Sequence, residues 1–399
     1  MTERVRFAAL HHRSLFQTRQ PAFWAFIAFL SYGAVRMVGV LSRLSEVSRS
    51  GWALSWLLLL LYSAPVFVLI YRFDLYEHEP LSLVFGAFAW GALAATALSI
   101  DATGWNQVVA SAFGTDFAAR WGAAITAPLV EEILKGAGVV LLYLVARDEV
   151  DDVMDGFVYG ALCGLGFALV EDVLYFMAAF GGTPAGVLQG FYVRVLSSGL
   201  YGHVLYTGLT GMAIGTVVSR RADVPIGRRL AIASGLCALA VGGHFLWNSP
   251  LLDLMPASPV TGARWLLVPV ALAVKGLPLL LLVGLAVRLA RRRERRWLDG
   301  VLTAEVGLDG ISKEELATLR FPKTRREAIA TMRTRAGRRA AALLGRLQRE
   351  QITLAMVASR VASSGDPALV AQRDYCRSLR DALAAIPGAA PTLVSGGAG

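Results

Sequence analysis

Charged residues are scarce in this chain of 399 residues. Asp, Glu, Lys and Arg make up 17% of it, against about 25% in typical soluble domains. The deficit comes from long runs that are almost free of charge, and runs of roughly 20 apolar residues are long enough to cross a bilayer. The composition therefore excludes an ordinary soluble protein and predicts an all-α fold, a polytopic membrane helix bundle.

Cysteine is scarce as well. The three cysteines lie far apart and form no Cys-x-x-Cys motif: Cys163, Cys237 and Cys376. This distribution disfavours a disulfide framework and a cysteine metal site. The His-Glu-x-x-His motif of many zinc proteases is also absent, so that motif gives no support for a metal.

Eight apolar segments are long enough to be transmembrane helices. They cover residues 22–41, 52–71, 82–100, 122–146, 155–180, 196–219, 228–248 and 266–290. The chain is thereby divided into an N-terminal arm (1–21), a helix bundle (22–290) and a C-terminal tail (291–399). No small-residue cleavage site is obvious near the first segment, so we expect it to remain in the protein as a span.

Arginines between the segments predict the orientation, because cytoplasmic loops carry an excess of Lys and Arg. With the N-terminus inside, the cytoplasmic side holds Arg72, Arg147, Arg220, Arg221, Arg228, Arg229, Arg291, Arg292, Arg293, Arg295 and Arg296. The external loops hold fewer: Arg43, Arg49, Arg120, Arg194 and Arg264. We therefore expect a protein of the plasma membrane with both termini in the cytoplasm.

The tail carries most of the net charge. From residue 291 onward there are 20 Lys and Arg against 11 Asp and Glu, a net of +9 out of +10 for the chain. Segments 312–320, 324–363 and 366–386 have helix-forming compositions, and the end from Pro387 is expected to be disordered. The tail is expected to lie beside anionic lipid or to bind a regulatory protein. No nucleic-acid-binding motif accompanies the charge, which disfavours nucleic acid as a partner.

The fourth segment carries three charged residues, although each charge at mid-bilayer costs about 2.5–3.5 kcal/mol. They are Glu131, Glu132 and Lys135. Lys135 follows the two carboxylates by four and three residues, so it can reach either of them on one face of a helix. A structural ion pair would explain the lysine and one glutamate, but it leaves the second glutamate unexplained.

The fifth segment contains a stripe of small residues followed by two further carboxylates. The small residues recur at every fourth position, at Gly156, Gly160, Gly164 and Ala168. Such a stripe allows a neighbouring helix to approach closely. We therefore expect it to bring the carboxylates, Glu171 and Asp172, near another helix.

Two of the five histidines lie inside apolar segments, His203 in the sixth and His244 in the seventh; the others are His11, His12 and His78. Counted from the outer ends of their segments, Glu131, Glu171 and the two histidines are roughly 6–14 Å deep at 1.5 Å per residue. Ionisable groups at one level on four helices indicate a site. Lys275 in the eighth segment is similarly deep and either pairs with a site carboxylate or extends to the surface.

In these residues the sequence resembles the PrsW-type intramembrane proteases, which are distantly related to the type II CAAX prenyl endopeptidases. The resemblance covers roughly residues 55–290 and rests on Glu-Glu-x-x-Lys at 131–135, Phe-x-x-x-Glu at 167–171, His203, and His-x-x-x-Asn at 244–248. The segments 74–80 and 155–167 also look like the family. Asp172 departs from it, because the family often has Asn at this position.

The resemblance implies an endopeptidase that cuts a membrane-anchored protein, for example an anti-sigma-factor-like protein, near the external surface. It implies Glu131 or Glu132 as the general base for an attacking water, with Lys135 balancing the paired charge. Asn248 would orient a histidine or donate to the oxyanion.

Ligand types and the resemblance together favour a divalent metal, with zinc as the first choice, bound by Glu171, His203 and His244. The same residues could instead hydrogen-bond the attacking water directly, and no metal would then be needed.

Two other functions are compatible with polar residues inside a bundle. An ion- or proton-coupled transporter also uses intramembrane Glu, Lys and His, but the sequence shows no convincing repeat of the kind common in transporters. A catalytically inactive scaffold would keep the cluster for assembly alone, yet all of the Glu and His residues of the resemblance are present.

Overall fold

The computed structural model describes residues 14–73, 79–147, 149–196, 202–219, 224–251, 269–270, 272–308, 310–361 and 363–389. The chain forms two compact units, Met1–Val287 and Arg288–Gly399. Several features named from the sequence lie outside the described residues. These are His11, His12, His78, Arg220, Arg221, Arg264, most of the family-like segment 74–80 and the chain end from residue 390.

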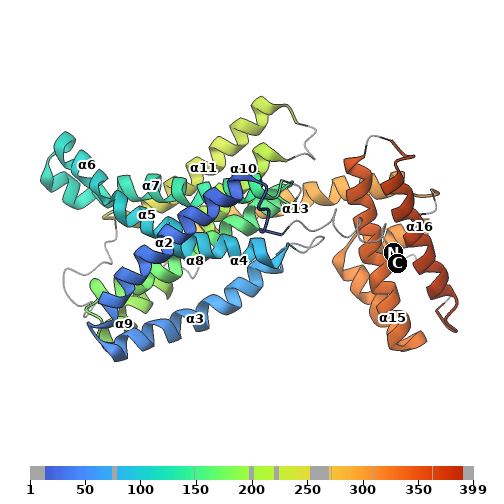
Figure 1. Ribbon diagram of the computed structural model, residues 1–399, viewed down its shortest axis with the longest axis horizontal. Coiled ribbons are helices and arrows are strands. Elements are labelled where there is room, and N and C mark those ends of the chain that lie inside the picture. Colours follow the sequence, from blue (N-terminus) through green and yellow to red (C-terminus); the bar gives the residue numbers. More distant parts are fainter. Residues whose placement is uncertain are drawn as a thin grey trace. The chain divides into compact units, whose positions relative to one another are not determined.

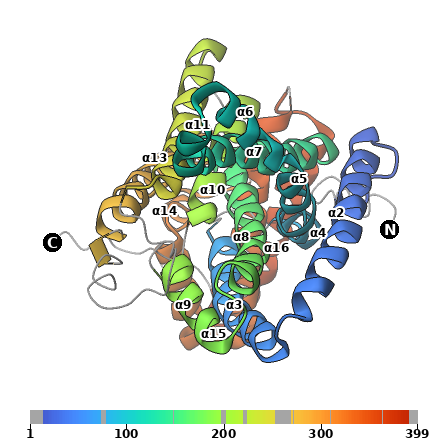
Figure 2. The same ribbon diagram turned by 90° about the vertical axis from the view of Figure 1, so that its left-hand side faces the viewer.

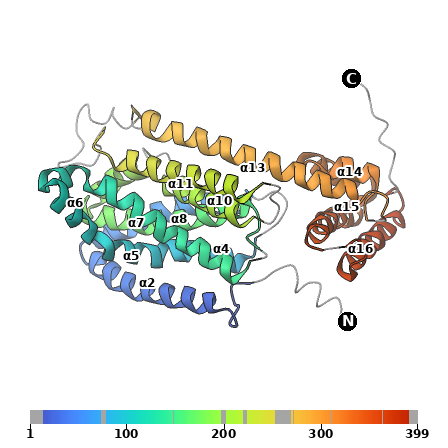
Figure 3. The ribbon, with the colours of Figure 1, turned by 90° about the horizontal axis from the view of Figure 1, so that it is seen from above.

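The first unit is a bundle of helices that run side by side (Figures 1 and 3). Its elements are α2 (Pro21–Ser45), α3 (Arg49–Tyr71), α4 (Leu81–Ala89), η1 (Trp90–Ala95), α5 (Thr96–Asp101), η2 (Ala102–Gly104), α6 (Trp105–Phe113), α7 (Thr115–Val145), α8 (Val153–Ala178), α9 (Pro184–Gly190), η3 (Phe191–Leu196), α10 (Gly202–Val218), α11 (Ile226–Asn248), η5 (Leu272–Gly276) and the start of α13 (Leu277–Ala304). Within the described ranges the regular elements are helices, apart from one β-bridge between Val306 and Ile311. The predicted all-α fold class is confirmed.

Six helices are long and apolar enough to cross a membrane: Pro21–Ser45, Arg49–Tyr71, Leu81–Phe113, Val153–Ala178, Ile226–Asn248 and Leu272–Ala304. The other two expected spans fall on α7 and α10. α7 has 31 residues, but the charges in its centre make it too polar to count as a membrane-crossing helix. α10, with 17 residues, is too short to count. The number of eight spans stays a prediction.

Helix α8 lies in the middle of this unit (Figure 2), and 94% of its most apolar stretch is buried. It begins with a capping box, in which Asp152 and Asp155 each accept a hydrogen bond from backbone N–H groups of the first turn. The cap satisfies amide groups that would otherwise be buried without partners at the helix start.

The small-residue stripe of α8 packs directly on α10. A Cβ atom placed on each of the three glycines would lie 2.2 Å from a backbone oxygen of α10. The pairs are Gly156 with Gly211, Gly160 with Thr207 and Gly164 with His203. The two backbones therefore touch, as the spacing predicted. One of these contacts is to the backbone of His203.

Contacts of similar closeness join η1 to α8 and to α7. Gly91 of η1 lies against the backbone of α8, and Gly166 of α8 lies against the backbone of α4. The indole N–H of Trp90 donates to the carbonyl of Leu134 in α7 at 2.9 Å, and its ring fills the space over Gly138. The site-bearing helix α7 is thereby held at a fixed distance from η1.

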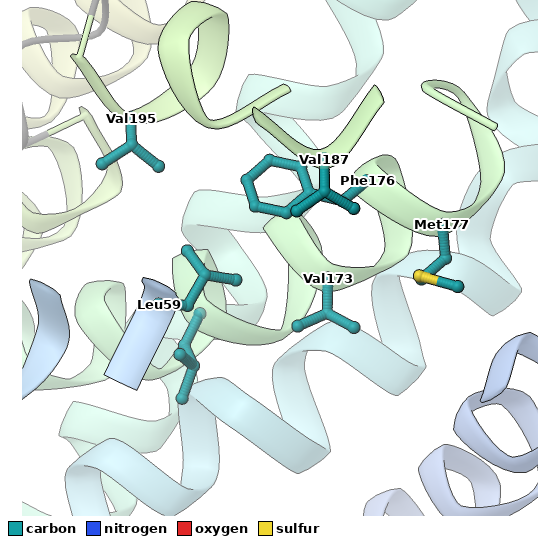
Figure 4. Close-up of a cluster of buried hydrophobic side chains, with 7 residues drawn as sticks. Leu59, Val173, Phe176, Met177, Val187 and Val195 are labelled. Carbon is teal, nitrogen blue, oxygen red and sulfur yellow. The ribbon is translucent and has the colours of Figure 1, made fainter. Parts of the chain in front are cut away.

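A cluster of apolar side chains holds the short helices α9 and η3 on α8 (Figure 4). It joins Leu59 of α3, four residues of α8, Val187 of α9 and Val195 of η3. Phe176 is completely buried in it. Because η3 also carries Arg194, this cluster fixes the position of a charged residue beside the end of α8.

The second unit contains the end of α13, α14 (Lys313–Leu319), α15 (Pro322–Arg360) and α16 (Pro367–Ala384). The sequence predicted helices at α14, α15 and α16, but not at residues 291–304 of α13. Gly337 interrupts α15 with φ +85°, a conformation that glycine tolerates without strain. Glu315 caps α14 together with Ser312 and pairs with Arg380 of α16 at 2.7 Å. This ion pair joins α14 to α16.

We expect Gly160→Ala to destabilise the protein, because the new methyl group would have to displace the backbone of α10. Overpacking of this kind costs about 1–3 kcal/mol. The measurement is the apparent melting temperature of the purified protein in detergent. Gly235→Ala is the matched control, since nothing lies within 4 Å of that position; equal melting temperatures for the two variants would contradict the close α8–α10 contact.

Candidate active site

The residues singled out from the sequence meet near one end of the bundle. They lie on four helices: Glu131, Glu132 and Lys135 on α7, Glu171 on α8, His203 on α10, and His244 and Asn248 on α11. α8 and α11 end at this level, and α10 begins there. The structure thus brings together groups that are more than 100 residues apart in the chain.

Lys135 lies at the centre of the cluster and is completely buried. Its Nζ atom is 2.6 Å from Oε1 of Glu132 and 3.5 Å from Oε2 of Glu131, so it reaches both carboxylates, as the spacing predicted. Nζ also lies 3.0 Å from Nδ1 of His203 and 4.3 Å from the ring centroid of Phe167. One ammonium group therefore compensates charge on two glutamates and contacts a histidine of another helix.

Glu132 points away from open space and has partners on both oxygens. Oε2 accepts hydrogen bonds from the hydroxyls of Thr207 and Thr210, at 3.1 Å each. Oε1 faces Lys135 and lies 3.4 Å from Nδ1 of His244. Glu132 thereby ties α7 to α10 and α11.

Each histidine has one ring nitrogen beside a carboxylate and the other directed toward Glu131. Nε2 of His203 is 2.8 Å from Oε2 of Glu171, and Nδ1 of His244 faces Glu132. The remaining nitrogens, Nδ1 of His203 and Nε2 of His244, lie 3.9 and 3.7 Å from Oε2 of Glu131. Carboxylates that hold the outer nitrogen of a histidine are typical of metal sites, where they orient the ligand ring.

Glu131 is the remaining carboxylate of the centre. Its Oε2 atom is buried and has no hydrogen-bond partner within the part of the chain that the structure describes. One ligand atom each from Glu131, His203 and His244 lies within 4.8 Å of the others. Ligand atoms around a tetrahedral zinc are about 3.3 Å apart, so small inward shifts suffice, and two histidines with one glutamate are a known catalytic zinc set. These three residues fit a divalent metal.

A cavity of about 600 Å³ leads to the centre. It is lined by Asp116, Ala119, Arg120, Ala123, Ala127, Glu131, Glu171, Tyr175, Val193, Arg194, His203, His244, Trp247, Asn248, Ser249, Pro250 and Lys275. Glu131 lines this cavity, whereas Glu132 does not. Lys275 donates to the backbone carbonyls of Trp247 and Ser249, at 3.1 Å each, and so binds the carbonyls at the C-terminal end of α11.

Comparison with known proteins agrees with this geometry. A family model described as PrsW family intramembrane metalloprotease matches residues 79–277, a range that contains every residue of the cluster. The chain belongs to the PrsW family. With its apolar helices it is an integral membrane protein.

A relative within the PrsW family is the protein named Protease PrsW from Geobacillus kaustophilus (strain HTA426). The two chains are 37% identical over 108 residues. The aligned part spans 27% of this chain and 45% of the relative, so the likeness covers less than half of either protein. No solved structure matches the chain.

Arg194 is a member of the cluster that sequence reasoning misplaced. The pattern predicted it in an external loop, but it lies in the π-helix η3, where its side chain is 10% exposed. Its guanidinium group is 2.6 Å from Glu171 and 2.6 Å from Asp172 and stacks over the ring of Tyr175 at 3.7 Å. It therefore compensates the extra acid at the position where the PrsW family often has Asn. Arg194 is only two residues before the expected sixth segment (196–219), and this closeness was the one sign in the sequence that it could take part in the cluster.

We expect Arg194→Met to destabilise the protein, because Glu171 and Asp172 would be left as adjacent, uncompensated carboxylates. Removing one partner of a buried ion pair costs about 3–5 kcal/mol. Asp172→Asn should be mild alone and should partly restore the Arg194→Met variant. Thermal unfolding of the four proteins of this double-mutant cycle is the measurement. Additivity within about 0.5 kcal/mol would contradict the coupling.

Proposed function

We propose that this chain is an intramembrane metalloprotease that hydrolyses a peptide bond of a membrane-anchored protein. The observation that carries the proposal is the arrangement around Oε2 of Glu131, a buried oxygen that has no hydrogen-bond partner among the described residues and lies 3.7–3.9 Å from one ring nitrogen of each histidine and 3.5 Å from Nζ of Lys135. The other ring nitrogens lie beside carboxylates. Membership in the PrsW family supports the same activity.

Glu131, His203 and His244 would hold the divalent metal, for which zinc is the first choice. Such an ion polarises a carbonyl group and lowers the pKa of a bound water. The charge of the surroundings favours it: Glu131 and Glu132 pair with Lys135, and Glu171 and Asp172 pair with Arg194. These four carboxylates and two cations leave two negative charges for a dication. Glu171, favoured as a ligand from the sequence, instead holds the outer nitrogen of His203.

The remaining catalytic roles are assigned to side chains of the protein. Glu131 would bind the ion through one carboxylate oxygen and accept a proton from the attacking water on the other, because it is the glutamate of the pair that lines the cavity. Glu132 and Lys135 position His244 and balance the charge of Glu131. Asn248, one turn after His244 on the cavity wall, is placed to donate its amide to a developing oxyanion.

Lys135 also supports a mechanism without a metal. Its Nζ atom is 3.0 Å from Nδ1 of His203, so the ammonium lies close to the nitrogens that would bind the ion. In that mechanism Glu131 and the histidines hydrogen-bond the attacking water directly. The two mechanisms share the same residues and differ in whether the purified protein contains metal.

The cavity indicates how a substrate would enter. Its lining extends from Glu131 along α7 to Asp116, about 22 Å at the helical rise of 1.5 Å per residue. A helical substrate has its backbone groups paired within the helix, so the scissile segment must unwind, and the polar wall supplies replacement partners. With both termini in the cytoplasm, cleavage would occur near the external surface of the plasma membrane, as for an anti-sigma-factor-like protein.

Removal of the carboxylate of Glu131 is expected to abolish cleavage. New N-termini in membrane proteins would be labelled in cells of the source organism that lack the chain and carry wild type, Glu131→Gln or Glu46→Gln. Glu46 is exposed just after α2 and serves as the matched control. Loss of acid–base catalysis lowers rates by about 10²–10⁴, so wild type and control should produce N-termini within single spans that the Glu131 variant does not.

The same N-termini from all three strains would show that the cluster is not their catalyst. In that case ion or proton uptake would be compared between cells with the wild-type protein and cells that lack the chain, to test the transporter function. Equal uptake in the two would favour the catalytically inactive scaffold.

Metal content tests the choice of ligands independently of activity. Elemental analysis of purified wild type is expected to find one divalent ion per chain, with low occupancy in Glu131→Gln, His203→Ala and His244→Ala. Glu132→Gln should weaken affinity by about 10–100-fold, as removal of a residue that orients a ligand does. Cys237→Ser is the control, because this exposed thiol lies on the same helix as His244. Metal-free protein that still cleaves in chelator would establish the mechanism without metal.

A further inference from the structure

The tail unit contains a basic pocket of about 500 Å³. Its polar lining residues are Arg292, Arg295, Arg296, Asp299 and Arg320, and Phe321 is beside them. All belong to residues 288–399, so the pocket is complete within one compact unit. It is also outside the range that matches the PrsW family.

Three arginines of the pocket share one face of α13. Arg292, Arg295 and Arg296 are separated by three and four residues, the spacing of neighbours on a helix surface. None of the three forms an ion pair with a carboxylate among the described residues; Arg295 and Arg296 donate only to backbone carbonyls of their own helix, at 3.4 and 3.3 Å. Like charges at this spacing repel, and an anion in the pocket would relieve that repulsion.

The chain folds back to add a fourth arginine and an aromatic ring. Arg320 is 2.6 Å from Asp299, so the carboxylate of the pocket is already occupied. Four guanidinium groups and one carboxylate leave a net charge of +3. Phe321 is 47% exposed, and its ring centroid lies 5.9 Å from the guanidinium carbon of Arg295. A basic pocket with an exposed aromatic ring is suited to a ligand that has both an anionic and an apolar part.

The position of the pocket in the sequence identifies that ligand. Arg292 comes two residues after Ala290, where the last apolar segment ends, and both residues belong to α13. At 1.5 Å per residue, Arg292 to Arg296 are about 3–9 Å beyond that point along the helix, at the level of lipid headgroups. Basic residues directly after a span are typical of sites for anionic headgroups.

We propose that this pocket binds the phosphate headgroup of an anionic phospholipid, with the acyl chains remaining in the bilayer. The guanidinium groups of Arg292, Arg295 and Arg296 contact the phosphate, since arginine binds phosphate oxygens with two parallel N–H groups. The proposal concerns the tail and does not depend on the proteolytic activity.

Native mass spectrometry of the full-length protein in detergent would test it. The protein is titrated with phosphatidylglycerol or with phosphatidylcholine of the same acyl chains, and the first binding constant of each is measured. Wild type is expected to bind phosphatidylglycerol at least tenfold more tightly. The triple variant Arg292→Gln/Arg295→Gln/Arg296→Gln should lose this preference, with binding about fivefold weaker for each arginine removed.

The matched control removes the same charge elsewhere in the tail. Arg333→Gln/Arg338→Gln/Arg339→Gln changes three exposed arginines of α15 and should keep the preference. Both variants are checked for unchanged helix content and melting temperature, which is expected because Gln suits an exposed helix position.

Three results would overturn the proposal. An equal loss in the control variant would show a general effect of charge, and an unchanged preference in the pocket variant would exclude the pocket. Water-soluble glycerol phosphate that displaces phosphatidylglycerol at equal concentration would identify a free phosphate compound, not a lipid, as the ligand.

Discussion

The buried ammonium of Lys135 is the charge on which the arrangement of this protein depends. It is completely buried in a helix that lies among apolar spans, where an unpaired charge costs several kcal/mol. Its contacts with Glu131, Glu132 and His203 offset that cost, and they require α7 and α10 to keep one alignment. The same contacts place the cavity-facing glutamate beside both histidines, so the charge compensation also builds the site.

This alignment is possible because the helices approach at backbone distance. The glycines of α8 leave no room for a side chain against α10, and the last of these contacts is to the backbone of His203. Arg194 then closes the other side of the cluster, where it compensates Glu171 and Asp172. The apolar cluster around Phe176 holds the helix that carries Arg194. Close contacts at small residues, apolar packing and ion pairs thus together fix the positions of the helices around the cluster.

Local patterns in the sequence were sufficient for much of this. Apolar runs predicted the all-α bundle, four-residue spacing predicted the glycine contact, and the i,i+3 and i,i+4 spacing predicted that Lys135 reaches both glutamates. These predictions depend only on the helical repeat. The position of Arg194 was predicted wrongly, because residues 181–195 contain no long apolar run and were expected to form a loop, whereas the structure has the short elements α9 and η3 there. Lys275 lies in another π-helix, η5, and its carbonyl partners were not foreseen because they are 26 and 28 residues away in the chain.

The sequence by itself determined the type of protein, the membrane-type helices and the set of ionisable residues that take part, because a charge inside an apolar run is visible without any structure. Only the tertiary structure decided what each of them faces. Glu131 and Glu132 are adjacent and chemically identical, yet Thr207 and Thr210 bind Glu132, while Glu131 lines the cavity. Those partners are about 75 residues away in the chain, and no local pattern records contacts made across such a distance.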